Sequence, residues 1–114
     1  MMEIKNIKEK DKNNLDILIK NLESKELNVD LRGSVKESSD YNDIDLNVWD
    51  TKKDYRENRN IISGCLTEIN AKEIDFNFIP TTWVTGRWRF KINETYFDLI
   101  YTPSGPHFQG YVQI

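Results

Sequence analysis

The stretch LRGSVKESSDYNDIDLNVW, residues 31–49, decides the fold predicted for this chain. Apolar residues at every second position predict a short strand over residues 27–33 that ends at Gly33. Residues 34–42 are rich in Ser, Asp and Asn, which is the composition of a loop. The alternation resumes over residues 43–49 and predicts a second strand. A polar loop that begins at a glycine–serine pair therefore joins two strands.

Helical and extended patterns lie on both sides of this stretch. Apolar residues at three- and four-residue spacing predict an amphipathic helix over residues 11–27, after a polar leader at residues 1–10. A second helix is predicted to start at Asp50 or Thr51, since either side chain can cap it, and to run to about Asn70. Further strands are predicted at residues 72–80, in a hairpin over residues 86–103 with Asn93-Glu94 at its turn, and in the tail at residues 104–114.

This element order predicts a single α+β domain over residues 1–114. Its core is a mixed sheet of about five strands with two helices packed on one face. The net charge of −3 gives no general attraction to nucleic acid phosphates. One cysteine and one histidine exclude an internal disulfide and a zinc site built by this chain alone. With no signal peptide or membrane-spanning run, we expect a soluble, cytoplasmic protein with no membrane partner.

Asp43 and Asp45 flank one isoleucine in the predicted second strand. Side chains alternate across a strand, so both carboxylates project from the same face. A divalent cation would neutralise them, and carboxylate oxygens favour Mg²⁺ or Mn²⁺. The simpler interpretation is an amphipathic strand with an acidic solvent face. A calcium loop of the EF-hand type is excluded, because Val48 stands where that loop needs glycine.

The glycine–serine pair favours the metal hypothesis. Gly33 lets the backbone approach an anionic ligand closely, and Ser34 supplies a hydroxyl and an N–H group. LRGS, eight intervening residues and then DIDL resemble the signature of the DNA-polymerase-beta-type nucleotidyltransferase superfamily. CCA-adding enzymes, oligoadenylate synthases and minimal nucleotidyltransferases belong to this superfamily. The loop after Ser34 is shorter than is usual there, and Glu37 and Ser38 stand near the place of a common glycine.

The resemblance implies the palm fold of that superfamily and a set of site residues. Gly33, Ser34 and Lys36 would bind the nucleotide, and Asp43 and Asp45 would bind two Mg²⁺ ions, with Mn²⁺ as a substitute. The superfamily uses a third carboxylate on a neighbouring strand, for catalysis and metal binding alike.

Two aspartates have the apolar-Asp-apolar context that this third carboxylate needs. Asp98 follows the predicted hairpin, as in the CCA-adding and oligoadenylate synthase layout, and is the favoured candidate. Asp75 directly follows the second helix, as in minimal nucleotidyltransferases, and is the alternative. On the first strand of the hairpin, Arg87, Arg89 and Lys91 share one face, which either steers a triphosphate or nucleic acid or is simply solvated.

The resemblance implies an enzyme that transfers a nucleoside monophosphate from a nucleoside triphosphate to a hydroxyl acceptor and releases pyrophosphate. The acceptor would be an RNA 3′ end or a protein side chain. Only sixteen residues follow Asp98, so no C-terminal helical base-binding domain is expected. Either a partner chain or a homodimer would complete the machinery, or the chain is a core fragment of a larger enzyme. The alternative, which the short loop favours, is a non-catalytic nucleotide-binding or antitoxin-type interaction module with a degenerate palm fold.

Overall fold

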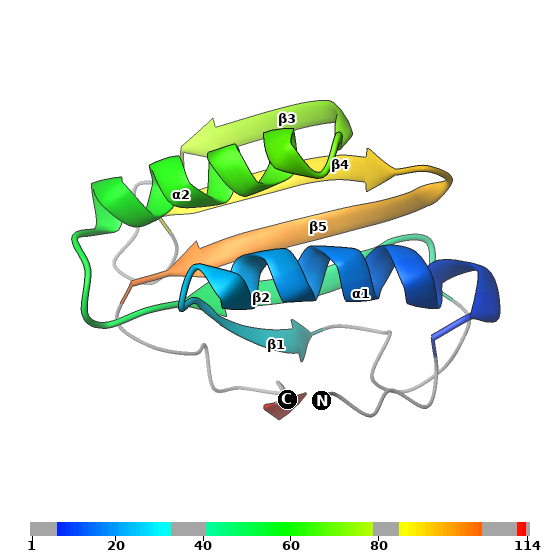
Figure 1. Ribbon diagram of the computed structural model, residues 1–114, viewed down its shortest axis with the longest axis horizontal. Helices are drawn as coiled ribbons and strands as arrows, with labels where there is room; N and C mark the ends of the chain where they lie inside the picture. The colour runs from blue at the N-terminus through cyan, green and yellow to red at the C-terminus, as the bar shows by residue number, and fades with distance from the viewer. Residues whose placement is uncertain (1–6, 33–40, 79–84, 104–111, 114) are drawn as a thin grey trace.

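The computed structural model describes residues 7–32, 41–78, 85–103 and 112–113. Two helices and six strands form an α+β domain (Figure 1). In chain order the elements are α1 (Glu9–Ser24), β1 (Asn28–Arg32), β2 (Ile44–Trp49), α2 (Tyr55–Glu68), β3 (Lys72–Phe78), β4 (Gly86–Ile92), β5 (Thr95–Thr102) and β6 (Val112–Gln113). The predicted fold class is confirmed, and the two-residue β6 lies in the tail, where a last strand was predicted.

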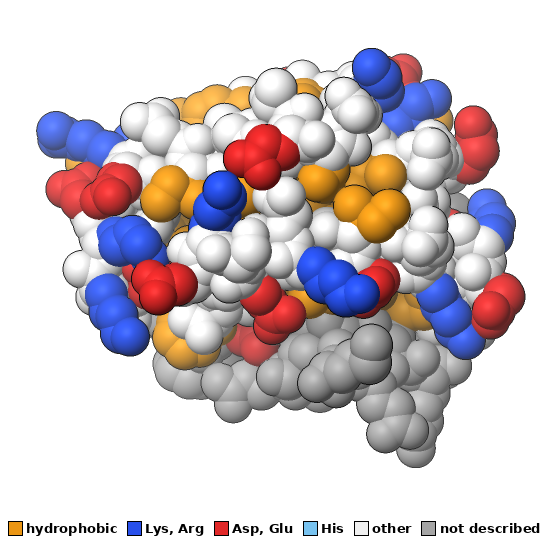
Figure 2. Space-filling model, in the orientation of Figure 1, with side chains coloured by type: hydrophobic (Ala, Val, Ile, Leu, Met, Phe, Trp, Pro, Cys, Tyr) orange, Lys and Arg blue, Asp and Glu red, His pale blue; other side chains and the backbone are white. Residues whose placement is uncertain are grey.

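The sheet is mixed, with the strand order β3-β4-β5-β2-β1-β6. Only β2 and β5 run parallel, and every other neighbouring pair in this sheet of described residues is antiparallel. Both helices lie on one face of the sheet (Figure 1). On the side that they cover, Lys/Arg and Asp/Glu side chains are interspersed (Figure 2). Among the described residues, neither helix has the length and apolar character needed to cross a membrane.

The buried face of α1 follows from its helical spacing. Leu15, Leu18, Ile19 and Leu22 are buried, as the apolar pattern predicted. The helix begins at Glu9, within the predicted leader, and ends at Ser24 instead of residue 27. It ends early because the backbone turns at residues 25–26, where Glu26 adopts a left-handed φ of 65°.

The start of α2 differs from the prediction. The helix begins at Tyr55, and its N-cap is Asp54, whose side chain accepts a hydrogen bond of 2.7 Å from the N–H of Arg56. Asp50 caps the preceding turn instead, and it accepts from the backbone N–H of Lys53 at 3.1 Å. Asp50 also accepts a hydrogen bond from the side chain of Asn58. Asp50 therefore caps the turn before α2, and Asp54 caps the helix itself.

The predicted hairpin of β4 and β5 is confirmed, with Asn93 at its turn in a left-handed conformation of φ 53°. Trp88, Phe90 and Ile92 are buried on the helix-covered side, so the aromatic face of β4 belongs to the core. The rings of Phe90 and Phe97 stack across the two strands with 5.4 Å between their centroids. This alternation places the basic residues of β4 on the side without helices.

A buried polar network holds the approach to β2. The hydroxyl of Tyr41 donates to one carboxylate oxygen of Asp11 at 2.6 Å, and the hydroxyl of Thr95 donates to the other at 2.7 Å. Asn14 donates to the same Thr95 hydroxyl at 2.8 Å. Burial and the hydrogen bond to Asp11 raise the pKa of Tyr41 to about 12. The network joins α1, the hairpin and residue 41, and so fixes the chain two residues before Asp43.

Candidate metal centre

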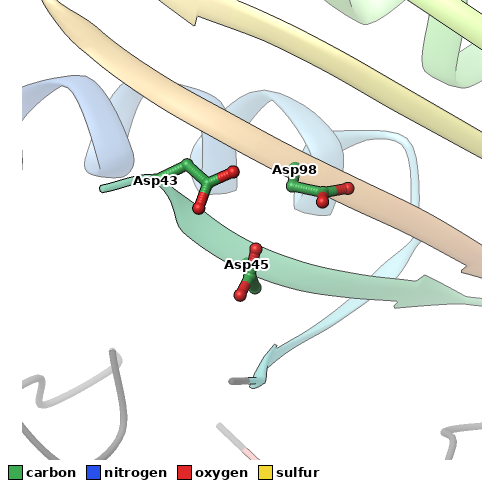
Figure 3. Close-up of side chains that lie close together, drawn as sticks. All are labelled: Asp43, Asp45 and Asp98. Atoms are coloured by element: carbon green, nitrogen blue, oxygen red, sulfur yellow. The ribbon is translucent and has the colours of Figure 1, made fainter. Parts of the chain in front are cut away.

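Three aspartates meet on the side of the sheet without helices. Ligand oxygens of Asp43, Asp45 and Asp98 all lie within 4.8 Å of one another. Their carboxylates gather between the start of β2 and the middle of β5 (Figure 3). Asp98 is buried, and the other two side chains are partly exposed. These are the three residues predicted from the sequence for the centre, and the fold brings them together.

Strand register explains the convergence. β2 and β5 pair in parallel, and in this register Asp45 lies directly beside Asp98. Side chains of directly paired residues point to the same face. Asp43 stands two residues before Asp45, just ahead of β2, and is therefore on that face too. Residues 43, 45 and 98 are thus brought together by the contact between two central strands.

Asp98 is also the centre of an arginine cluster. Arg87 donates to both of its carboxylate oxygens, with its Nε at 2.9 Å from Oδ1. Arg32 places Nη2 at 3.1 Å from Oδ1 and also donates to the backbone carbonyls of Leu46 and Asp98. Arg89 is more distant, with Nε at 3.9 Å from Oδ2. The three guanidinium groups balance the formal charge of the three aspartates.

This cluster decides the ionisation of Asp98. Burial by itself raises the pKa of this carboxyl, because the charged form loses water. The hydrogen bonds from Arg87 and the charges of Arg32, Arg87 and Arg89 outweigh burial, so the pKa lies below its ordinary value. The same contact raises the pKa of Arg87. Asp98 is therefore a carboxylate at neutral pH.

Asp45 titrates in the opposite direction. Burial raises its pKa from 3.8 to about 6, and the negative charges of Asp43 and Asp98 add to the rise, while Arg32 opposes it. A cation at this place would favour the ionised form of Asp45 and lower its pKa.

The donor set fits a hard divalent cation. All three side chains offer carboxylate oxygens, which Mg²⁺ and Mn²⁺ prefer. Burial is the main cause of the raised pKa of Asp45, and the charges of Asp43 and Asp98 add to it, so a cation bound here would offset both effects. Asp98 differs from an ordinary ligand, since Arg87 already contacts both of its oxygens. A cation would have to share Asp98 with Arg87 or displace it.

The other predicted site residues do not enter this geometry. Asp75 lies on β3 and is exposed, with β4 between its strand and β5. The group of possible metal ligands among the described residues does not include it. Gly33, Ser34 and Lys36 lie outside the described residues. Arg32, the last residue of β1, immediately precedes Gly33 and is in contact with the centre.

The ion pairs of Arg32 and Arg87 with Asp98 were not predicted from the sequence. Part of the signal was available: a turn at Asn93-Glu94 sets the hairpin register and places Arg89 opposite Asp98. Arg87 is displaced by two residues along the same face and reaches Asp98 diagonally. The position of Arg32 depends on the pairing of β1 with β2, which places Arg32 opposite Asp45 and so next to Asp98.

A scan against models of known protein families finds no match for this chain, and a search of curated proteins also finds none.

Proposed function

We propose that this protein is a Mg²⁺-dependent nucleotidyltransferase. It transfers a nucleoside monophosphate from a nucleoside triphosphate to a hydroxyl group and releases pyrophosphate. The observation that carries the proposal is the convergence of Asp43, Asp45 and Asp98, whose ligand oxygens lie within 4.8 Å of one another. A glycine–serine pair follows the strand next to β2 in the sequence, where a phosphate-binding loop is expected.

The acidic residues are the metal ligands in the proposal. Asp43 and Asp45 would hold both metal ions, and Asp98 would be a further ligand of one of them. Bound Mg²⁺ supplies charge neutralisation at the phosphates and lowers the pKa of the attacking hydroxyl. Gly33 and Ser34 hold the β- and γ-phosphates, and Lys36 adds a positive charge.

The bond changes are those of an in-line displacement. The acceptor oxygen forms a bond to the α-phosphorus, and the bond from that phosphorus to the bridging oxygen of the β-phosphate breaks. Pyrophosphate leaves with the electron pair, and the hydroxyl proton passes to solvent. The acceptor is an RNA 3′ end or a protein hydroxyl, and a cytoplasmic location supplies nucleoside triphosphate, Mg²⁺ and either acceptor.

Radiolabelled nucleotides test the proposal directly. The protein is incubated with each α-labelled nucleoside triphosphate, Mg²⁺ and either RNA or candidate protein acceptors. We expect label transfer and pyrophosphate release by the wild type and the Asp75→Asn variant, and loss of both in Asp45→Asn. Asp75→Asn is the matched control, because it removes an exposed carboxylate outside the centre. Equal background in all three proteins, with folding intact, contradicts the proposal.

Metal binding is measured separately from turnover. Mn²⁺ titration followed by electron paramagnetic resonance counts bound ions in the absence of nucleotide. We expect binding by the wild type and Asp75→Asn, with at least about tenfold weaker binding by Asp45→Asn, which loses one anionic ligand. Equal Mn²⁺ binding by all three proteins contradicts the assignment of the centre.

One observation favours a second candidate function, a non-catalytic nucleotide-binding or antitoxin-type module. Asp98 is already neutralised by arginines, as a degenerate metal site would be. In this alternative, the hydrogen bonds between Arg87 and the Asp98 carboxylate persist when nucleotide binds, and no pyrophosphate forms. Nucleotide binding that is unchanged by removal of divalent cations, together with no turnover, would favour the module over the enzyme.

A further inference from the structure

The outer edge of the sheet at β3 carries an unusual set of exposed side chains. β3 is the last strand in the sheet order, and all seven of its residues are exposed. Ile74, Phe76 and Phe78 are 44%, 45% and 57% exposed. Figure 1 places β3 at one margin of the sheet, and Figure 2 shows hydrophobic side chains along that margin. Edge strands with apolar residues in alternation are templates for pairing with another strand.

We infer that β3 pairs with β3 of a second copy of this chain, in antiparallel orientation. The resulting dimer has a two-fold axis perpendicular to the sheet and joins two sheets into one. A symmetric interface requires a surface that is complementary to itself. The sequence of β3 meets this requirement most fully in one register.

The favoured register is centred on Phe76. Phe76 then faces Phe76 of the second copy, and Ile74 faces Phe78, so three apolar cross-strand pairs lie on the helix-covered side. On the other side, Asp75 faces Asn77, a pair without charge conflict. The two polar residues already contact each other within one copy, where Asn77 donates to Asp75 at 3.4 Å.

Neighbouring registers are less favourable. A register centred on Asn77 avoids like charges, but it forms two apolar pairs, between Phe76 and Phe78, instead of three. A register centred on Asp75 puts two aspartates face to face, and one centred on Ile74 puts Glu73 against Asp75. Like charges directly opposite each other destabilise a strand pair. At the start of β3, the register shift between Lys72 and Asp75 and the left-handed φ of 54° at Glu73 bend the strand away from regular pairing. The segment available for pairing is therefore Ile74–Phe78.

The position of Phe76 is prepared in the monomer. Its ring packs against Trp88 with 4.9 Å between centroids. A side chain at Gly86 would come within 2.9 Å of Trp88 and 3.1 Å of Phe76, so glycine at this position leaves room for the aromatic pair. Arg59 covers part of the Phe78 ring, at 5.0 Å from its centroid. The apolar side of the edge is thus ordered before a partner arrives.

The dimer would set the two aspartate centres on the same open face. A two-fold axis perpendicular to the sheet leaves both pairs of helices on one side and both centres on the other. Five strand spacings separate β5 of one copy from β5 of the other, which corresponds to about 24 Å. The inference does not depend on the proposed enzymatic activity.

Substitutions at Asn77 test both the dimer and its register. Sedimentation equilibrium over a concentration series gives the dimer dissociation constant. In the favoured register, Asn77→Asp sets a new carboxylate against Asp75 of the second copy at two places per dimer, whereas Asn77→Lys creates two ion pairs there. We expect the aspartate to weaken the dimer about fivefold to tenfold and the lysine to strengthen it by a similar factor. Both effects should diminish at high salt.

In the monomer, the same substitutions have opposing neighbours. Asn77 lies opposite Arg87 on β4 and contacts Asp75 of its own strand, so an aspartate and a lysine each gain one favourable and one unfavourable neighbour. Urea denaturation of the two variants measures the effect on folding separately from the effect on assembly. A wild type that stays monomeric at all concentrations overturns the inference, as does a dimer that is indifferent to both Asn77 variants.

Disulfide formation provides a second measurement. In the favoured register, Phe76→Cys places two thiols opposite each other across the axis, whereas Phe78→Cys faces Ile74 of the second copy. We expect Phe76→Cys to form a covalent dimer under mild oxidation and Phe78→Cys to do so much more slowly. The native Cys65 is buried, so it serves as an internal control in both proteins. Equal rates, or a faster rate for Phe78→Cys, overturn the register.

Discussion

Asp98 and Asp75 share a local sequence pattern and have opposite environments. Each aspartate stands between two apolar residues on a strand, and both side chains project from the side of the sheet without helices. Asp98 on β5 is buried, neutralised by arginines and close to two further carboxylates. Asp75 on the edge strand β3 is exposed, and its cross-strand partner is Arg89.

The difference shows that the position of a strand in the sheet decides what an aspartate can do. β5 lies between β4 and β2, so Asp98 meets an arginine from one neighbour and a carboxylate from the other. Charges in this partly buried setting interact strongly because little water screens them. At the edge, water surrounds Asp75, and an ion pair there contributes little.

The largest expected effect on stability is that of removing the Asp98 carboxylate, and removal of the Asp75 carboxylate is the matched comparison. Asp98→Ala leaves Arg87 and Arg32 without their shared anion, and we expect a loss of about 3 kcal/mol in the free energy of unfolding. Asp75→Ala should change it by about 0.5 kcal/mol or less, because the residue is exposed. Urea denaturation followed by circular dichroism measures both. Similar losses of unfolding free energy in the two variants would contradict the claim that an aspartate on β5 contributes more to stability than one on β3.

Enzymatic turnover should also depend on Asp98 much more than on Asp75. We expect Asp98→Ala to abolish Mg²⁺-dependent pyrophosphate release and Asp75→Ala to spare most of it. The reverse result would move the third carboxylate to β3, as in the layout of minimal nucleotidyltransferases. Measurement well below the denaturation midpoint of each variant separates lost chemistry from lost folding.

The arginines of β4 give the next effect in size. Arg87→Met removes a two-pronged contact with Asp98 and should lower the free energy of unfolding by about 1–2 kcal/mol, since Arg32 remains. Arg89→Met is the control, because Arg89 is farther from Asp98 and 55% exposed. We expect added Mg²⁺ to raise the melting temperature of Arg87→Met more than that of the wild type, since Arg87 competes with the cation for Asp98. An equal rise in both would show that the arginine and the cation do not compete.

The raised pKa of Asp45 predicts a smaller, pH-dependent effect. Between 3.8 and about 6, the folded protein retains a proton on Asp45 that the unfolded chain releases. The contribution of this carboxyl to stability is therefore greatest at low pH, falls as the pH rises toward 6, and is lost above it. Asp45→Asn does not ionise, so its melting temperature should exceed that of the wild type at pH 8. The excess should shrink as the pH falls from 6 to 4, and Mg²⁺ should shrink it at pH 8 by stabilising the wild type. An excess that is constant with pH contradicts the assigned pKa.

The smallest effect is expected at the edge strand. Lys91 and Glu73 form an ion pair at 3.2 Å, and Glu73 is 64% exposed. We expect no measurable change in the denaturation midpoint of Lys91→Gln at physiological salt, because water and ions screen the pair. A midpoint change as large as that of Arg87→Met would show that the edge and the centre of the sheet do not differ in this respect.

Local patterns in the sequence predicted most of the secondary structure. The helical spacing of apolar residues in α1 and the alternation in β2 and β4 each indicate which face is buried, and the structure confirms those faces. In β5, by contrast, both faces are buried from Phe97 to Thr102. Helix boundaries were less predictable. Asp50 and Asp54 are both good capping residues. The hydrogen bonds from Lys53 and Asn58 to Asp50, and from Arg56 to Asp54, show that α2 begins after Asp54 and not after Asp50.

The carboxylates of the candidate site could be predicted from the sequence. The arginines that neutralise Asp98 could not. Asp43 and Asp45 share a face because of the two-residue period of a strand. The choice between Asp98 and Asp75 needed the strand order, since both have the same local context. The pairing of Arg87 and Arg32 with Asp98 needed three strands at once.

By itself, the sequence determined the element types, the buried faces and the common side of Asp43 and Asp45. These features depend on spacing along one segment, where the geometry of a helix or strand relates neighbours directly. Tertiary structure alone decided that β5 lies beside β2, that arginines neutralise Asp98 and that β3 is left at the edge. Such features depend on contacts between segments far apart in the chain, and the spacing within any one segment carries no information about them.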